Sequence, residues 1–80
     1  MRDKLIVMAN QIGQFFGSQR GRDPVEDIAD HLRRFWDPRM RREAIALLRD
    51  GGERLDPLPR QAIEILARDD SPVAQQDGAA

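Results

Sequence analysis

The chain offers few side chains that could perform covalent or acid–base chemistry. It has no cysteine, no tyrosine and one histidine, His31, and its two serines, Ser18 and Ser71, each fall in a segment that we expect to be flexible. Catalysis requires reactive groups that converge at one point, and a typical zinc site requires several histidine or cysteine ligands. We therefore expect this chain by itself to have no catalytic residue, no metal site and no bound cofactor.

Arginines gather in one short stretch of the sequence. The segment HLRRFWDPRMRR at residues 31–42 contains five arginines and one aspartate, a local charge of +4 in a chain whose net charge is −1. A solvated helix face explains the first two arginines. The other three are Arg39, Arg41 and Arg42. They fall at the expected start of a helix, where the helix dipole already makes the potential positive, so carboxylate or phosphate groups of a partner would suit them.

The same stretch contains two adjacent aromatic residues beside the histidine. With a helical period of 3.6, Trp36 lies near the centre of an apolar stripe, and Phe35 and His31 lie toward its edge. Because Trp36 is the last residue before a helix ends, we expect it to be half buried. Packing of Trp36 over the corner is favoured over an exposed interface hot spot. For His31, an edge contact with Phe35 or Asp27 is favoured over a chemical role.

Three Asp-Pro steps divide the sequence, at Asp23-Pro24, Asp37-Pro38 and Asp56-Pro57. Each is typical of a helix start, because aspartate caps free backbone N–H groups and proline at the first helical position has no N–H to leave unpaired. Glu26, three residues after Asp23, adds a pattern typical of a capping box. The pair Gly51-Gly52 can end the preceding helix.

The spacing of apolar residues agrees with these boundaries. It predicts helices near residues 3–18, 24–36, 38–50 and 57–69. No segment shows the sustained alternation that is typical of a strand. We predict an all-α protein, a small bundle of about four short amphipathic helices, with a single helical domain at 1–69 and a flexible, disordered tail at 70–80.

Charge and hydropathy also narrow the class of partner. The longest apolar run, residues 5–9, is far too short to cross a bilayer and does not have the form of a signal peptide. The absence of cysteine suits a reducing compartment. We expect a cytoplasmic protein without a membrane partner, and the slightly acidic chain as a whole gives no reason to expect a nucleic-acid partner.

Two motifs carry a family resemblance. MANQI at Met8–Ile12 and HLRRFWDPRMR at His31–Arg41, followed by a GG and LDPL segment, are similar to the delta subunit of the cytoplasmic, molybdenum-containing, NAD-dependent formate dehydrogenases. The resemblance covers most of the chain, from about Lys4 to Leu66. The linker at Gly17–Arg22 and the tail beyond Asp70 carry no part of it.

The resemblance implies an accessory role in a larger enzyme. In that family the catalytic alpha subunit holds bis-molybdopterin guanine dinucleotide and iron–sulfur clusters, and the beta and gamma subunits carry electrons to NAD through FMN and further clusters. The small delta subunit accompanies this complex and supports cofactor loading, assembly or stability of the active enzyme. The resemblance thus assigns the chemistry to the partner subunits.

Together, the residues and the resemblance give a docking hypothesis. The residues expected to bind the catalytic subunit are His31, Phe35, Trp36, Arg39, Met40, Arg41 and Arg42. In this hypothesis Trp36 is the apolar anchor and the arginines pair with acidic groups, or, in a less favoured version, with cofactor phosphates during insertion. The alternative is a small helical nucleic-acid-binding or regulatory module that uses the basic Arg33–Arg42 region. The apolar continuation of the third helix argues against base recognition.

Overall fold

The computed structural model describes residues 2–19, 21–50 and 52–69. These residues form four α-helices and one short 3-10 helix, with no strand among them. The helices are α1 (Arg2–Gly17), α2 (Pro24–Phe35), α3 (Pro38–Asp50), the 3-10 helix η1 (Gly52–Arg54) and α4 (Pro57–Asp69). The predicted all-α fold is confirmed, and each α-helix begins and ends within one residue of its predicted bounds. The predicted tail at 70–80 lies outside the described residues.

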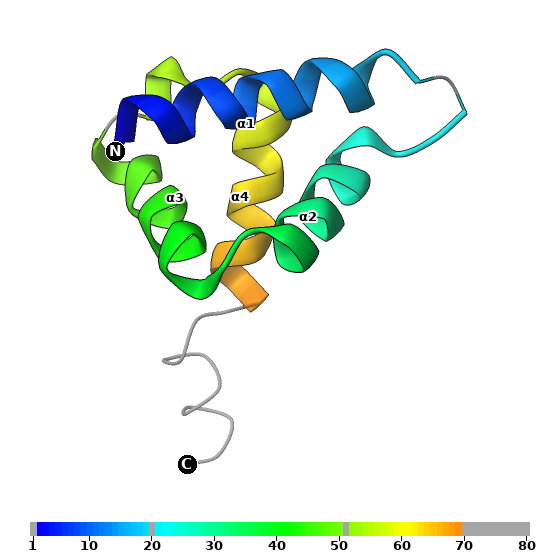
Figure 1. Ribbon diagram of the computed structural model, residues 1–80. Coiled ribbons are helices and arrows are strands. Elements are labelled where there is room, and N and C mark those ends of the chain that lie inside the picture. The colour runs from blue at the N-terminus through cyan, green and yellow to red at the C-terminus, as the bar shows by residue number, and fades with distance from the viewer. Residues whose placement is uncertain (1, 20, 51, 70–80) are drawn as a thin grey trace.

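Helix α4 is the element against which the others pack. Figure 1 shows α1, α2 and α3 in front of α4, which passes behind them. α4 contacts each of the other three helices, and its contact with α2 is the most extensive in the molecule. The residues that α4 buries share one face of the helix, since they lie three or four positions apart: Pro59, Ala62, Ile63 and Leu66.

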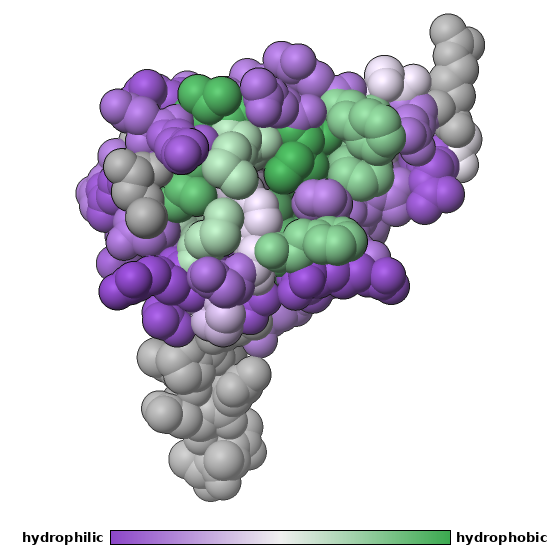
Figure 2. Space-filling view, in the orientation of Figure 1, coloured by the Kyte–Doolittle hydropathy of each residue, from purple (hydrophilic) through white to green (hydrophobic). Residues whose placement is uncertain are grey.

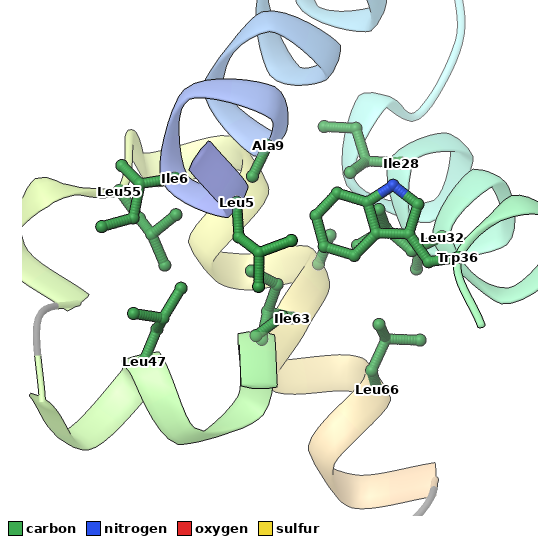
Figure 3. Close-up of a cluster of buried hydrophobic side chains, with 13 residues drawn as sticks. Leu5, Ile6, Ala9, Ile28, Leu32, Trp36, Leu47, Leu55, Ile63 and Leu66 are labelled. Atoms are coloured by element: carbon green, nitrogen blue, oxygen red, sulfur yellow. The ribbon is translucent and has the colours of Figure 1, made fainter. Parts of the chain in front are cut away.

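One apolar core joins the four helices (Figure 3). Its centre is the contact between α2 and α4, where Ile28, Leu32, Ile63 and Leu66 are completely buried. Full burial of a side chain of this size stabilises the fold by about 1.5–3 kcal/mol. The buried apolar side chains are Leu5, Ile6, Ala9, Ile28, Ala29, Leu32, Trp36, Ala44, Leu47, Leu55, Ala62, Ile63 and Leu66.

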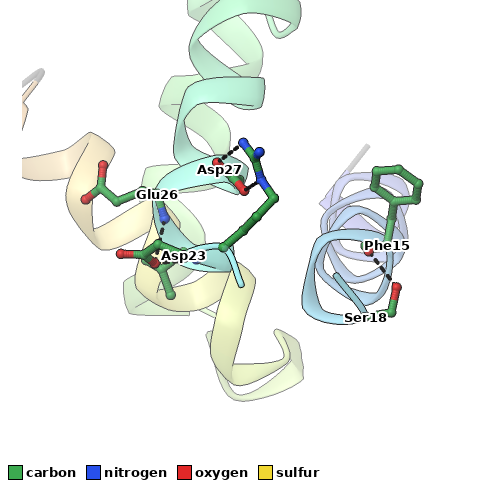
Figure 4. Close-up of polar contacts among 7 residues, drawn as sticks. Phe15, Ser18, Asp23, Glu26 and Asp27 are labelled. Carbon is green, nitrogen blue, oxygen red and sulfur yellow. Dashed lines mark hydrogen bonds and ion pairs between the residues drawn. The ribbon is translucent and has the colours of Figure 1, made fainter. Parts of the chain in front are cut away.

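Two of the predicted aspartate caps are present. The Asp23 carboxylate accepts hydrogen bonds from the N–H groups of Val25 at 3.1 Å and Glu26 at 3.3 Å, at the start of α2 (Figure 4). The Asp37 carboxylate accepts from the N–H of Met40 at 2.8 Å, at the start of α3. Each bond satisfies an N–H that has no partner within the helix.

The third Asp-Pro step is held through its backbone by a residue of α1. The Asn10 side chain accepts a hydrogen bond from the N–H of Asp56 at 2.8 Å and donates one to the carbonyl of Arg54 at 3.1 Å. One amide therefore fixes the backbone on both sides of the buried Leu55. This clamp gives a physical role to the asparagine of the MANQI motif, for which the sequence alone offered none.

About one helical turn after Asn10, α1 passes very close to the start of α4. A Cβ atom placed on Gly13 would lie 2.7 Å from Cδ of Pro59, and one placed on Gly17 would lie 2.9 Å from Cδ1 of Leu58. Both distances are shorter than a carbon–carbon contact allows. Glycine at these positions lets the two helices approach.

Asn10→Ala is expected to lower the free energy of unfolding by about 1–2 kcal/mol, because the N–H of Asp56 and the carbonyl of Arg54 lose their partner. Urea denaturation followed by circular dichroism measures the change. Gln11→Ala is the matched control, since Gln11 is exposed on the same helix and should change stability by less than about 0.5 kcal/mol. Equal stability of the two variants would contradict the clamp.

The two glycines provide a second stability test. Gly13→Ala is expected to destabilise the fold by about 1–3 kcal/mol, because the rigid ring of Pro59 cannot move away without repacking α4. Gly17→Ala meets only the end of the flexible Leu58 side chain, so its cost should be smaller and partly offset by the better helix propensity of alanine. A Gly13→Ala variant as stable as Gly17→Ala would show that the close approach is not a constraint.

Candidate docking surface

The corner between α2 and α3 turns Trp36 into the core. The side chain is 4% exposed, and Figure 3 shows the indole directed into the core cluster, toward Leu5 of α1. The expectation that Trp36 is half buried is therefore wrong, whereas the favoured packing role is confirmed. The physical reason is tertiary: a helix end covers its own last residue poorly, but neighbouring helices complete the cover. An indole closed in this way offers almost no surface to a partner.

Arg41 also makes its contacts within the corner between α2 and α3. Its Nη1 donates hydrogen bonds to the carbonyl of Trp36 at 2.8 Å and to the carbonyl of Arg33 at 3.1 Å. These carbonyls belong to the end of α2, where backbone acceptors lack helical partners. Arg41 is partly buried, and its guanidinium closes the end of one helix from the first turn of the next.

Two further arginines of the basic stretch are neutralised within the chain. Arg33 pairs with Asp69 at the end of α4, and Arg34 pairs with Asp30 one turn earlier at 3.1 Å. Arg39 and Arg42 remain: both are exposed, and neither makes a hydrogen bond or ion pair within residues 2–19, 21–50 and 52–69. The five arginines thus divide into three with a partner within the chain and two without one among the described residues.

A row of aromatic rings crosses from α1 to α2. The ring centroids of Phe15 and Phe16 are 5.0 Å apart, those of Phe16 and His31 5.8 Å apart, and those of His31 and Phe35 4.8 Å apart. We call these four residues the aromatic row. Spacings in this range are favourable for edge and tilted ring contacts. The predicted contact of His31 with Phe35 is confirmed.

The two ends of the aromatic row are open to solvent. Phe15 is 59% exposed and Phe35 is 70% exposed. Figure 2 shows apolar surface over the second half of α1 and near the end of α2, bordered by hydrophilic surface. Met40 is partly buried and packs against the core, so its contribution to this surface is smaller than that of Phe35.

Sequence reasoning placed His31 and Phe35 at the edge of α2 but did not include Phe15 and Phe16 in the site. The signal was present in the sequence. Successive helical residues point about 100° apart, so two adjacent phenylalanines on a narrow stripe cannot both enter the core. The structure sends Phe16 partly inward and leaves Phe15 exposed.

The connection from α1 to α2 is fixed beside this surface by an ion pair. Arg22 donates to Asp27 from Nε at 2.7 Å and from a terminal nitrogen at 3.1 Å (Figure 4). The hydrogen bonds from Arg22 lower the pKa of Asp27 below its ordinary value of 3.8. Gly21, with φ of +76°, makes the turn that precedes the pair. The pair therefore joins the segment after α1 to the first turns of α2.

The fold and this surface define a class of protein. Exposed aromatic residues with unpaired arginines are the composition of a protein–protein interface. Within the described part of the chain, no group of three or more histidine, cysteine, aspartate or glutamate side chains is placed to hold a metal ion. Among the same residues, no helix has both the length and the apolar character to cross a membrane. The structure is that of a small all-helical protein with exposed aromatic side chains on its surface.

The comparison with protein families shows to which family the chain belongs. Residues 4–63 match the NADH-dependent formate dehydrogenase delta subunit family, FdsD. The chain belongs to this family, which confirms the resemblance carried by the two motifs. No curated protein and no solved structure matches the chain significantly. The aromatic row thus lies on the surface of a member of a formate dehydrogenase delta subunit family.

Arg22→Gln is expected to raise the pKa of Asp27 toward 3.8, because the carboxylate loses the charged donors that favour its ionised form. A lowered pKa stabilises the fold above pH 3.8, and this stabilisation is lost as the pH falls through the lowered value. The free energy of unfolding of the variant should therefore depend less on pH in that acidic range than that of the wild type. Carboxyl carbon shifts in an NMR titration measure the pKa. Asp3, whose pKa is lowered by Arg54, is the internal control and should not move.

Proposed function

We propose that this chain is a non-catalytic accessory subunit that binds the molybdenum-containing catalytic subunit of an NAD-dependent formate dehydrogenase through the aromatic row. The observation that carries the proposal is the exposure of Phe15 and Phe35 at the two ends of that row. Family membership supplies the complex to which such a surface belongs. Compared with the sequence hypothesis, the apolar anchor moves from Trp36 to its neighbour Phe35.

Burial of the aromatic row against a partner would contribute favourable free energy to binding. Burial of one phenylalanine side chain contributes about 1.5–3 kcal/mol before the costs of association. The ring of His31, itself in contact with Phe16, already packs against Phe35 on one side, so less side-chain freedom is lost when a partner covers Phe35. A preorganised aromatic patch of this kind suits a central anchor of an interface.

The proposed role in the complex is to support cofactor loading, assembly or stability of the holoenzyme. A subunit that binds the folded, loaded form of its partner more tightly than the empty form shifts the partner toward the loaded form. In this proposal the catalytic subunit carries the bis-molybdopterin guanine dinucleotide and iron–sulfur clusters, and the beta and gamma subunits carry FMN and the clusters that lead to NAD. The delta subunit contributes contacts and no redox group.

A nucleic-acid-binding role is the alternative that the basic Arg33–Arg42 region suggested. The internal partners of Arg33, Arg34 and Arg41 weaken it, because these side chains are engaged by a carboxylate or by backbone carbonyls. A gel shift with duplex DNA and with RNA at increasing salt tests this alternative, since phosphate binding must weaken steeply with salt. We expect no shift at moderate salt.

Replacing both exposed phenylalanines, Phe15→Ser with Phe35→Ser, is expected to weaken binding to the catalytic subunit about tenfold or more, because the interface loses its apolar anchors. Biolayer interferometry with immobilised catalytic subunit measures the affinity. The fold should persist, since both side chains are largely outside the core. Trp36 is not a suitable position for this test, because truncating a buried tryptophan costs about 3–5 kcal/mol of stability.

Val7→Ser is the matched control for the phenylalanine variant. Val7 is also an exposed apolar residue of α1, at 52%, but it lies about 12 Å from Phe15 along the helix axis and is not part of the aromatic row. It should leave the affinity unchanged. Molybdenum content and formate-dependent NADH formation of co-expressed enzyme should fall with the double variant only. Equal affinity of wild type, control and double variant would refute docking through the aromatic row.

A further inference from the structure

Arg39 and Arg42 of α3, a few residues after the exposed Phe35, are themselves exposed and have no counter-charge among the residues that the structure describes. Arg39 and Arg42 are three residues apart, so they share one face of the helix. Within the described residues, five other arginines are each paired with a carboxylate. These are Arg2, Arg22, Arg33, Arg34 and Arg54. Carboxylates thus neutralise these five guanidinium groups, whereas Arg39 and Arg42 have no carboxylate partner among the described residues.

The carboxylates closest in sequence to these two arginines are already used. Glu43 is four residues after Arg39, the spacing of a helical ion pair, but it receives a hydrogen bond from Arg2 of α1 at 3.3 Å. Asp37, on the other side, accepts the N–H of Met40 and caps α3. A local cap thus engages Asp37 and a tertiary contact engages Glu43, which leaves two like charges on one face of α3.

We propose that the surface of the catalytic subunit that covers the aromatic row carries carboxylates beside its apolar contact, and that these pair with Arg39 and Arg42. This inference rests on the proposed function and specifies the chemistry of its partner surface. Guanidinium and carboxylate groups match in shape and can form two parallel hydrogen bonds. Phe35, the last residue of α2, supplies the apolar contact, and the arginines in the first turns of α3 fix its orientation.

The aromatic residues and the arginines contribute to binding in different ways, because their chemistry differs. An aromatic surface supplies affinity but little direction, because apolar contact is roughly proportional to area. Charged groups at the edge of an interface set orientation, exclude wrong partners and speed association at low salt. A partner with an apolar patch but no acidic groups would leave Arg39 and Arg42 without counter-charges at the edge of the interface. The site therefore selects an acidic and apolar surface.

The test is a charge reversal, Arg39→Glu with Arg42→Glu, measured by interferometry against the catalytic subunit at low and high salt. We expect the affinity to fall about tenfold or more at low salt, and the salt dependence that the wild type shows to be lost. Lys4→Glu with Arg49→Glu is the matched control: both residues are exposed, the net charge changes equally, and neither lies at the corner. The control should bind as the wild type does.

The results for the phenylalanine variant and the charge reversal together distinguish this inference from the proposed function. If the phenylalanine variant loses binding while the charge reversal binds within about twofold of wild type, the acidic partner surface is wrong and docking through the aromatic row stands. If neither variant changes the affinity, the proposed docking surface itself is wrong. A charge reversal that binds the catalytic subunit normally, in a chain whose wild type binds pyrophosphate in calorimetry, would assign the arginines to phosphate and overturn the inference.

Discussion

The turn between α2 and α3 decides which of two adjacent aromatic side chains enters the core. The Asp37 carboxylate fixes the first N–H groups of α3, and Arg41 reaches back to the carbonyl of Trp36. With the backbone held on both sides, Trp36 has one direction available, toward α1 and the core. Phe35, the last residue of α2, lies outside the core and is 70% exposed. The core contact and the exposed aromatic surface are two results of the same constraint.

The aromatic row also depends on contacts made far from it. Phe15 and Phe16 come from α1, whereas His31 and Phe35 come from α2. The row forms only if α1 lies at one position along the other helices. The Asn10 amide and the close approach at Gly13 set that position against the start of α4. One family motif, MANQI, therefore serves the geometry, and the other contains the buried Trp36 together with the exposed Phe35 and Arg39.

The electrostatics of the corner differ from what its composition suggests. A count of residues gives a strongly basic stretch, which is why nucleic acid and cofactor phosphates entered as possible partners. In the folded chain, ion pairs and carbonyl contacts occupy Arg33, Arg34 and Arg41. Arg39 and Arg42, which follow the exposed Phe35 closely in the sequence, are the two without a partner among the described residues. Such a combination favours a protein surface with a few acidic groups over a continuous line of phosphates.

The sequence by itself determined the helices and the family. Asp-Pro steps and apolar spacing act within one or two turns, so the bounds of all four α-helices followed from local chemistry, and the motifs indicated the family. Only the tertiary structure decided that Trp36 is buried, that Phe16 meets His31, and that Glu43 serves Arg2 instead of Arg39. These outcomes depend on pairs of residues far apart in the chain. A local period fixes the face of a helix but not the neighbour that the face will meet.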